Sequence, residues 1–465
     1  MVALFVAAYS LIRLLSFFTY HHPIANQMIA ALLILAFAYY CFKNLKFGWL
    51  LLVTELLIDG AGHFFELQSL LLRTWFLGIF AIAWIIHIFK TKQFPWPHRS
   101  IIYSGTALGF FVLYATLNGF YHHHTTTYIL QDAIIYAFLG LVFPAKEWYE
   151  ELKEPFLNTI KAWVIGSTLF STITLFIYSS GLGYLPDTYY HWFRNVASGK
   201  ITDLGNHFFR IVLPEHLLIV PIIIVITAFL IRNPKDKMLW ALQIGSALVL
   251  ALNFSRIYFL ALAIGLLALV IKQNFKQWFI VSALSGLSVL VLFSSVHLIS
   301  SRGQSSGLEL LGLRLGGTVA PTADVSGAIR LAILPNALGQ IKERPILGSG
   351  FGAIVTYLDP ATKEYVSRTQ FDWGYLEMLV EFGILGTIAF LAFFTTLLTK
   401  SIKTVYFAKE QNTFAHGLMA GALTLIIINI TTPALFHGFG ILYFVLMLAV
   451  NDVWTQLSAS LHDTV

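Results

Sequence analysis

The sequence predicts an all-α, polytopic membrane protein: a bundle of about 12–14 transmembrane helices with one large folded loop. Apolar residues fill 57% of the 465 positions and charged residues only 11%, whereas soluble domains are roughly one quarter charged. The mean hydropathy of +0.75 indicates more apolar side chains than one core can bury, so most must face lipid. This composition excludes an ordinary soluble enzyme and predicts a single membrane domain over residues 1–465.

Fourteen apolar runs are candidates for spans, since a helical crossing needs about 20 mostly apolar residues. The run at 45–59 is the least secure, which leaves the span count near 45–75 open. The first run has neither a basic segment before it nor a clear cleavage site, so an uncleaved first span is expected. The runs lie at about 1–18, 24–42, 45–59, 70–89, 101–119, 127–143, 156–178, 208–231, 238–253, 256–271, 277–298, 373–399, 413–432 and 438–453.

The basic residues follow an alternating pattern along these runs. Fifteen of the 29 Lys and Arg lie in short loops on one side, whereas the intervening short loops at 19–23, 59–69, 120–126 and 433–437 hold none. This positive-inside pattern places both termini in the cytoplasm. The net charge of +6 is therefore a topology signal and does not indicate a nucleic-acid partner. The lone Cys41 excludes an internal disulfide and a thiolate zinc site.

Two longer connections, at 179–207 and 299–371, are both expected on the outer side. The second contains apolar residues at helical spacing, followed by a segment rich in Gly and Pro at 345–352. Because long loops within compact proteins are usually functional or disordered, this pattern favours an ordered loop that lies on the membrane face.

Four pieces of the chain, in order, resemble the O-antigen ligase and Wzy-type polymerase superfamily. The resemblance covers roughly residues 205–450. The large loop supplies an Arg at a helix start, a Pro about fifteen residues later and then G-x-G, and the next helix ends in E-x-G-x-x-G. The pieces are Arg210, the pair Ser255-Arg256, the segment RLAILPNALGQIKERPILGSGFG at 330–352 and the segment DWGYLEMLVEFGILG at 372–386.

This resemblance implies an enzyme of the bacterial inner membrane that transfers a glycan from an undecaprenyl diphosphate carrier to an acceptor hydroxyl on the outer face. Ligases of the superfamily carry a His where this chain has Asp372, and many polymerases have an Asp there. The polymerase is therefore the preferred function, producing O-antigen, capsule or exopolysaccharide. The implied partners are the lipid-linked donor and acceptor, the bilayer, and a chain-length regulator and a flippase.

The leaving diphosphate requires cations. Arginine suits this role because its planar guanidinium donates paired hydrogen bonds to phosphate oxygens. Arg210, expected to open the span at 208–231, and Arg256, expected to open the span at 256–271, would both lie at outer ends. His207, Arg210 and Pro214 would share one helix face, with a kink at Pro214. The alternative for either arginine is a cation whose side chain extends to the membrane interface or pairs with a nearby carboxylate.

Asp372 precedes the apolar run after the large loop, so its carboxylate is expected at the outer interface. There it could accept the proton of the acceptor hydroxyl as a general base. The alternative is an N-cap, because Asp is among the preferred capping residues; the two roles are compatible.

The remaining candidates are substrate contacts. Arg330 and Arg344 could bind sugar or phosphate, or be solvated charges of a helix face. Gly348 and Gly350 could present backbone amides to a phosphate, or could simply form a tight turn. Tyr375 and His207 complete the set. Glu381 is expected to pack against or hydrogen-bond to a neighbouring helix, since about 180° separates it from Asp372 around a helix.

Other function classes remain open. A ligase would transfer the glycan to a lipid A-core or another acceptor, and a lipid-linked glycan flippase or secondary transporter would usually carry charges at the midplane of broken helices. A transferase that uses polyprenyl-phosphate sugars normally needs acidic residues in the first outer loop, and residues 19–23 contain none. The predicted outer loops contain no Asp-x-Asp pair, so neither a metal nor another cofactor is predicted.

Overall fold

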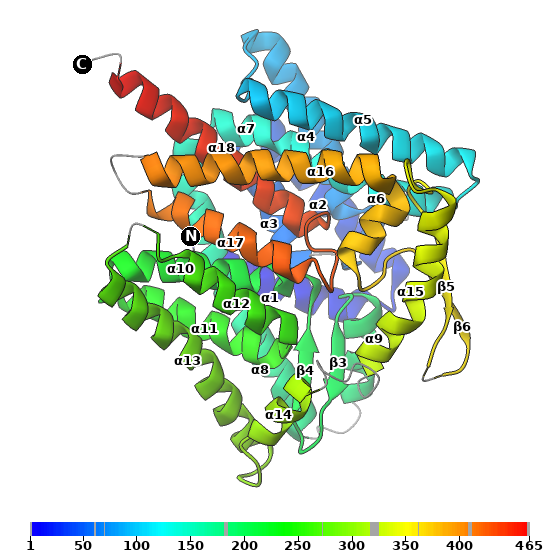
Figure 1. The fold of residues 1–465 in the computed structure, drawn as a ribbon, viewed down its shortest axis with the longest axis vertical. Coiled ribbons are helices and arrows are strands. Elements are labelled where there is room, and N and C mark those ends of the chain that lie inside the picture. Colours follow the sequence, from blue (N-terminus) through cyan, green and yellow to red (C-terminus); the bar gives the residue numbers. More distant parts are fainter. Residues whose placement is uncertain are drawn as a thin grey trace. The chain divides into compact units, whose positions relative to one another are not determined.

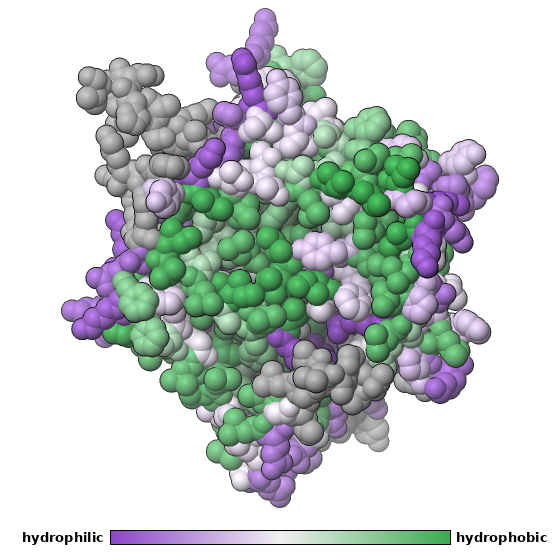
Figure 2. Space-filling model, in the orientation of Figure 1, coloured by the Kyte–Doolittle hydropathy of each residue, from purple (hydrophilic) through white to green (hydrophobic). Residues whose placement is uncertain are grey.

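The chain is almost entirely helical, which confirms the prediction of an all-α polytopic membrane protein (Figure 1). The computed structural model describes residues 2–59, 62–68, 70–180, 185–271, 273–316, 325–360, 362–407 and 412–462. Within these ranges, nine helices are long and apolar enough to cross a membrane, and four shorter apolar helices accompany them. Hydrophobic side chains cover much of the face that Figure 2 shows, as lipid contact requires.

The residues group into two compact units, and the single membrane domain stays a prediction. The first unit contains 1–95, 143–255 and 273–307. Asp236 caps α11 by accepting hydrogen bonds from the amides of Met238 and Leu239, as Asp does at helix N-termini. The elements are α1 (Val2–Thr19), α2 (Pro23–Lys43), α3 (Leu45–Asp59), β1 (Glu66–Leu67), β2 (Leu70–Leu71), α4 (Leu72–Thr91), α7 (Val142–Glu147, whose first residue belongs to the second unit), α8 (Tyr149–Ser180), α9 (Leu185–Asn195), β3 (Lys200–Asp203), β4 (Phe209–Val212), η2 (Pro214–Leu218), α10 (Ile219–Arg232), α11 (Lys237–Asn253) and α13 (Phe275–Ser300).

The second unit contains 96–142, 256–272 and 308–465. Here α16 packs against α5 and α17, and α12 packs along α17. The elements are α5 (Arg99–Tyr121), α6 (Thr126–Ala137), η1 (Phe138–Leu141), α12 (Arg256–Ala268), α14 (Leu308–Gly316), α15 (Val325–Glu343), β5 (Val355–Leu358), β6 (Tyr365–Arg368), α16 (Gly374–Phe407), α17 (Thr413–Ile428) and α18 (Gly438–His462).

The predicted helix at 208–231 begins later than expected. β4 pairs with β3 in an antiparallel hairpin that places Thr202 opposite Arg210, and helix begins only at Pro214, with η2. Leu213 has extended backbone angles, φ −120° and ψ 153°, because a following proline disfavours the helical conformation. The expected helix face shared by His207, Arg210 and Pro214, and the kink at Pro214, are therefore wrong.

The predicted large loop at 299–371 is folded in its described part. The hairpin of β5 and β6 packs with α15, and α15 packs with the start of α16. Ile333, Val355, Phe371 and Val380 belong to one buried cluster that joins these elements. Residues 317–324 of this loop lie outside the described ranges. The packing fixes the large loop against the first turns of α16.

A break inside α16 strengthens this attachment. Gly383 has φ +64° and ψ −170°, and the segment 345–350 fills the interruption. A side chain at Gly383 would place Cβ 2.4 Å from the amide nitrogen of Gly348, so only glycine fits. Four backbone hydrogen bonds join the two segments: Ile384 N to Pro345 O (2.9 Å), Leu385 N to Ile346 O (3.1 Å), Ser349 N to Val380 O (2.7 Å) and Gly350 N to Glu381 O (3.0 Å).

Candidate active site

Asp372 and Arg330 form the centre of the candidate site in the second unit. Arg330 Nη2 on α15 donates to Asp372 Oδ2 at 3.5 Å. The Asp372 side chain is 47% exposed and that of Arg330 only 20%. Arg330 Nε is buried and has no hydrogen-bond partner among the described residues. The pair combines an accessible carboxylate with a guanidinium that is held in place.

The backbone around Asp372 is fixed on both sides. Glu377 Oε2, on the first turn of α16, accepts from the amide of Phe371 at 2.9 Å. Trp373 Nε1 donates to the carbonyl of Arg330 at 3.2 Å. α16 begins at Gly374, and in the described structure the hydrogen-bond partner of the Asp372 carboxylate is Arg330. This geometry favours a carboxylate paired with Arg330 over the capping role.

Arg256 and Tyr375 lie at one end of α17. His416 near the start of α17 is hydrogen-bonded to the backbone of Ala268, the last residue of α12. Because α12 packs along α17, the two helices are antiparallel, and Arg256 at the start of α12 lies toward the last turn of α17. Tyr375 Oη donates to the carbonyl of Ile426 in this turn at 3.0 Å. The start of α12 and the start of α16, with Asp372 before it, thus meet the same end of α17.

Arg210 and His207 belong to the first unit. Arg210 lies on β4, and its Nε donates to the carbonyl of Asn253 at 2.7 Å. A cation at the end of α11 also interacts favourably with the helix dipole. Asn253 precedes Arg256 by three residues in the sequence. His207 is exposed, with φ +58°, and its carbonyl accepts from Ser179 Oγ at 3.1 Å.

The glycine turn at 348–352 has a structural role, as the tight-turn alternative predicts. None of its five amides is left for a phosphate, because each donates to an acceptor in the protein. The partners are Arg344 O for Gly348, Val380 O for Ser349, Glu381 O for Gly350, Ala115 O for Phe351 and Asp132 Oδ2 for Gly352. The turn therefore joins α5, α6 and α16, and the amides of Gly348 and Gly350 are not left as donors for a ligand.

Arg344 lies just after α15, beside the connection between α5 and α6. Its charge contributes, after burial, to a lowered pKa of His122. Arg344 is half-buried, and this position keeps it a candidate for an anionic contact.

Three buried carboxyl groups, those of Asp132, Glu377 and Glu381, lie near the glycine turn at 348–352, on helices of the second unit. Asp132 on α6 accepts from the amide of Gly352 at 2.9 Å and is hydrogen-bonded to the side chains of Glu381 and Gln370. Glu377 is the third, and only 1% of it is exposed. The prediction that Glu381 bonds to a neighbouring helix is thus confirmed, with α6 as that helix.

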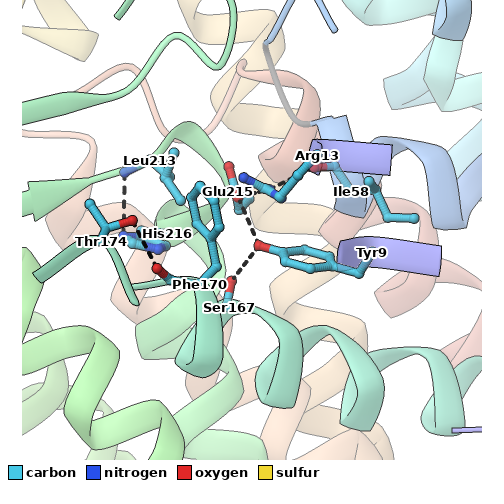
Figure 3. A network of polar contacts seen from close by, with 9 residues as sticks. All are labelled: Tyr9, Arg13, Ile58, Ser167, Phe170, Thr174, Leu213, Glu215 and His216. Atoms are coloured by element: carbon cyan, nitrogen blue, oxygen red, sulfur yellow. Dashed lines mark hydrogen bonds and ion pairs between the residues drawn. The ribbon is translucent and has the colours of Figure 1, made fainter. Parts of the chain in front are cut away.

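A second buried polar network lies in the first unit (Figure 3). Arg13 on α1 donates through Nη2 to the carboxylate of Glu215 and to the carbonyl of Ile58 at 2.7 Å. Tyr9 Oη donates to Glu215 Oε1 at 3.5 Å and lies 3.3 Å from Ser167 Oγ. Arg13 and Glu215 are 3% and 1% exposed, so this is a buried ion pair.

Neither Arg13 nor Asp132 belongs to the motifs that predict the site. A usable signal was present, because each is an ionisable residue inside an apolar run of spanning length, the runs at 1–18 and 127–143. Such residues are rare in spans and usually face the protein interior.

Residues 241–391 match the sequence model of the family Wzy_C, described as O-antigen ligase. The match contains Arg256, Arg330, Asp372 and Tyr375 and confirms the resemblance to the O-antigen ligase and Wzy-type superfamily. It supports a multi-pass membrane enzyme of the glycosyltransferase type that acts on lipid-linked glycans. No curated protein matches this sequence.

Proposed function

We propose that the protein polymerises oligosaccharide repeat units linked to undecaprenyl diphosphate, on the outer face of the bacterial cytoplasmic membrane. The observation that carries this proposal is the Asp372–Arg330 pair, an accessible carboxylate with a half-buried arginine beside it. The family match supports glycan transfer, and the Asp in place of the ligase His favours the polymerase.

The proposed reaction requires a base for the acceptor hydroxyl and cations for the leaving diphosphate. The acceptor hydroxyl attacks the anomeric carbon of the donor sugar, and a glycosidic C–O bond forms while the bond from that carbon to the diphosphate oxygen breaks. Asp372 accepts the proton of the hydroxyl. Arg256 binds the departing diphosphate through charge-assisted hydrogen bonds, and Arg330 and Arg344 contact the substrate. Arg210, in the first unit, is a separate candidate for a phosphate contact, on the resemblance alone.

The proposed orientation has both termini in the cytoplasm and the 299–371 loop outside. The distribution of basic residues in the short loops supports it. A thiol reagent that cannot cross the membrane should label a cysteine introduced at Ser305 and leave one at Lys235 unlabelled. The reverse labelling would place the candidate site on the wrong side for this reaction.

Asp372→Asn tests the proposal most directly. Asn still accepts a hydrogen bond from Arg330 and caps a helix about as well as Asp, but it cannot take a proton at neutral pH. We expect polymer formation from the lipid-linked repeat unit in proteoliposomes to fall by roughly 10²-fold or more, with the protein level unchanged. Polymer yield near that of the wild type would reject Asp372 as the base.

Arg256→Lys provides the companion measurement. Lysine keeps the charge and loses the planar pair of donors, so we expect severe loss of turnover in protein that inserts normally. Unchanged turnover would reduce Arg256 to an interfacial cation.

The ligase is the second candidate, and the O-antigen ligase description of the matching family favours it. A deletion strain separates the two activities. Loss of long glycan, with a single repeat unit still attached to the final acceptor, identifies a polymerase. Accumulation of lipid-linked polymer identifies a ligase.

A further inference from the structure

The second unit contains a pocket of about 290 Å³, and none of the residues assigned to the proposed reaction lines it. This volume lies near the lower limit of ligand pockets, roughly 300–1,000 Å³, so it suits a single small ring. The lining residues come from the start of α6, from β6 and its continuation, and from the residue before β5: Tyr128, Ile354, Ser367, Arg368, Thr369 and Gln370.

Contacts with residues outside the pocket hold its polar side chains in place. The guanidinium of Arg368 lies over the ring of Tyr357, with Cζ 5.8 Å from the ring centre. Ser367 Oγ is 2.8 Å from Thr356 Oγ1, and Gln370 is hydrogen-bonded to the buried Asp132. A ligand therefore meets groups that are already oriented, which lowers the entropy lost on binding.

The backbone of the pocket is fixed as well. Side-chain amides of α15 bind the strand that forms one wall: Gln340 Nε2 donates to the carbonyl of Ile354 at 2.7 Å, and Asn336 Nδ2 donates to that of Thr356 at 2.8 Å. The pocket thus belongs to the same folded body as Arg330 on α15.

The chemistry of the lining matches a sugar ring. A guanidinium, an amide and two hydroxyls offer donors and acceptors to neighbouring hydroxyl groups. The exposed ring of Tyr128 and the side chain of Ile354 offer apolar surface to the C–H faces of a pyranose. Arg368 is the one basic residue in the lining. A single positive charge does not balance a diphosphate, so the lining fits a sugar better.

The pocket lies next to the candidate base. Gln370 precedes Asp372 by two residues, which span at most about 7 Å of extended chain. Phe371 between them is buried and bonded to Glu377. The wall formed by Gln370 is therefore separated along the chain from the residue that would accept the proton only by Phe371, whose position is fixed.

We propose that this pocket binds a monosaccharide of the acceptor glycan and places it beside Asp372. This inference rests on the proposed function and names the part of the substrate that the second unit recognises. Arg368, Gln370 and Tyr128 are the residues that determine this specificity.

Kinetics in proteoliposomes test the pocket. Arg368→Gln and Tyr128→Leu alter two different walls, and Lys363→Gln in the turn of the same hairpin is the matched control because Lys363 does not line the pocket. We expect both pocket variants to raise KM for the lipid-linked repeat unit roughly tenfold, with kcat within about twofold and the control unchanged. An unchanged KM in both pocket variants would overturn the proposal.

Direct binding provides the second readout. The probe is the repeat-unit oligosaccharide released from its carrier by mild acid, followed by saturation-transfer NMR with the Asp372→Asn protein, which should not turn over. We expect transfer to the sugar protons and its loss when Arg368→Gln is added. Competition by inorganic diphosphate would assign the pocket to the leaving group and overturn the sugar assignment.

The two proposals fail in different ways. If Asp372→Asn abolishes turnover while the pocket variants behave as the wild type, the pocket is wrong and the function stands. If Asp372→Asn leaves turnover intact, the proposed base is wrong, whatever the pocket variants do.

Discussion

Two buried polar networks, one in each unit, balance charge in opposite ways. In the first unit, Arg13 and Glu215 pair a cation with a carboxylate. In the second unit, Asp132, Glu377 and Glu381 are all acidic, and two of them are hydrogen-bonded to each other. A hydrogen bond between two carboxyl groups requires one proton, and this shared proton takes the place of the arginine between Asp132 and Glu381.

The contrast predicts which substitution each network tolerates. A buried ion pair contributes little net stability, but removal of one partner is costly because the other charge remains without compensation. A protonated carboxyl group carries no such charge. The same change from Glu to Gln should therefore have unequal effects in the two units.

Glu215→Gln should have the largest effect. It leaves the Arg13 guanidinium buried without its counter-charge, and we expect the free energy of unfolding to fall by about 3–5 kcal/mol. Thermal unfolding in detergent, followed by tryptophan fluorescence, measures the change. The double variant Arg13→Gln with Glu215→Gln should recover part of the loss. A double variant less stable than either single variant would mean that the pairing of charges is not the dominant contribution.

Glu381→Gln should have a smaller effect. The amide of Gln can donate to Asp132 as the shared proton does now, so we expect a loss of about 1 kcal/mol or less. Asp132→Ala is the contrasting variant: it removes the acceptor of the Gly352 amide and should cost about 1–3 kcal/mol. The same unfolding assay applies. A loss for Glu381→Gln as large as that for Glu215→Gln would contradict the comparison.

The exposed pair of Lys46 and Glu151 should have the smallest effect. These side chains are 40% and 62% exposed, so solvent and salt screen their attraction. We expect Glu151→Gln to change the unfolding free energy by less than about 0.5 kcal/mol. The measurement is repeated at low and high salt. A larger, salt-independent loss would show that exposure is a poor guide to the strength of pairing in the first unit.

The helices of this fold were largely predictable because hydropathy is a local property of the sequence. The exception near Arg210 has a local cause as well, since Leu213 before Pro214 favours an extended chain. Hydropathy also cannot distinguish a lipid-facing helix from a buried one: Leu52 and Val53 of α3 are fully buried, yet they look like residues of a span.

The candidate site was predictable only in part. The motifs pointed to Asp372 and Arg330 separately, whereas their pairing across 42 residues depends on α15 packing against α16. The bond between Glu381 and Asp132 depends on α6 in the same way. Arg368 and Gln370 carry no motif, and only the folded hairpin brings them together with Tyr128.

The break in α16 at Gly383 also bears on biosynthesis. Inside a bilayer, the interruption would leave backbone groups without partners, at a cost of several kcal/mol each, and the segment 345–350 supplies those partners. This segment precedes α16 in the chain, so the ribosome releases it first. When α16 reaches the translocation machinery, the segment 345–350 has already been synthesised. The backbone partners of the break are therefore available when α16 enters the lipid.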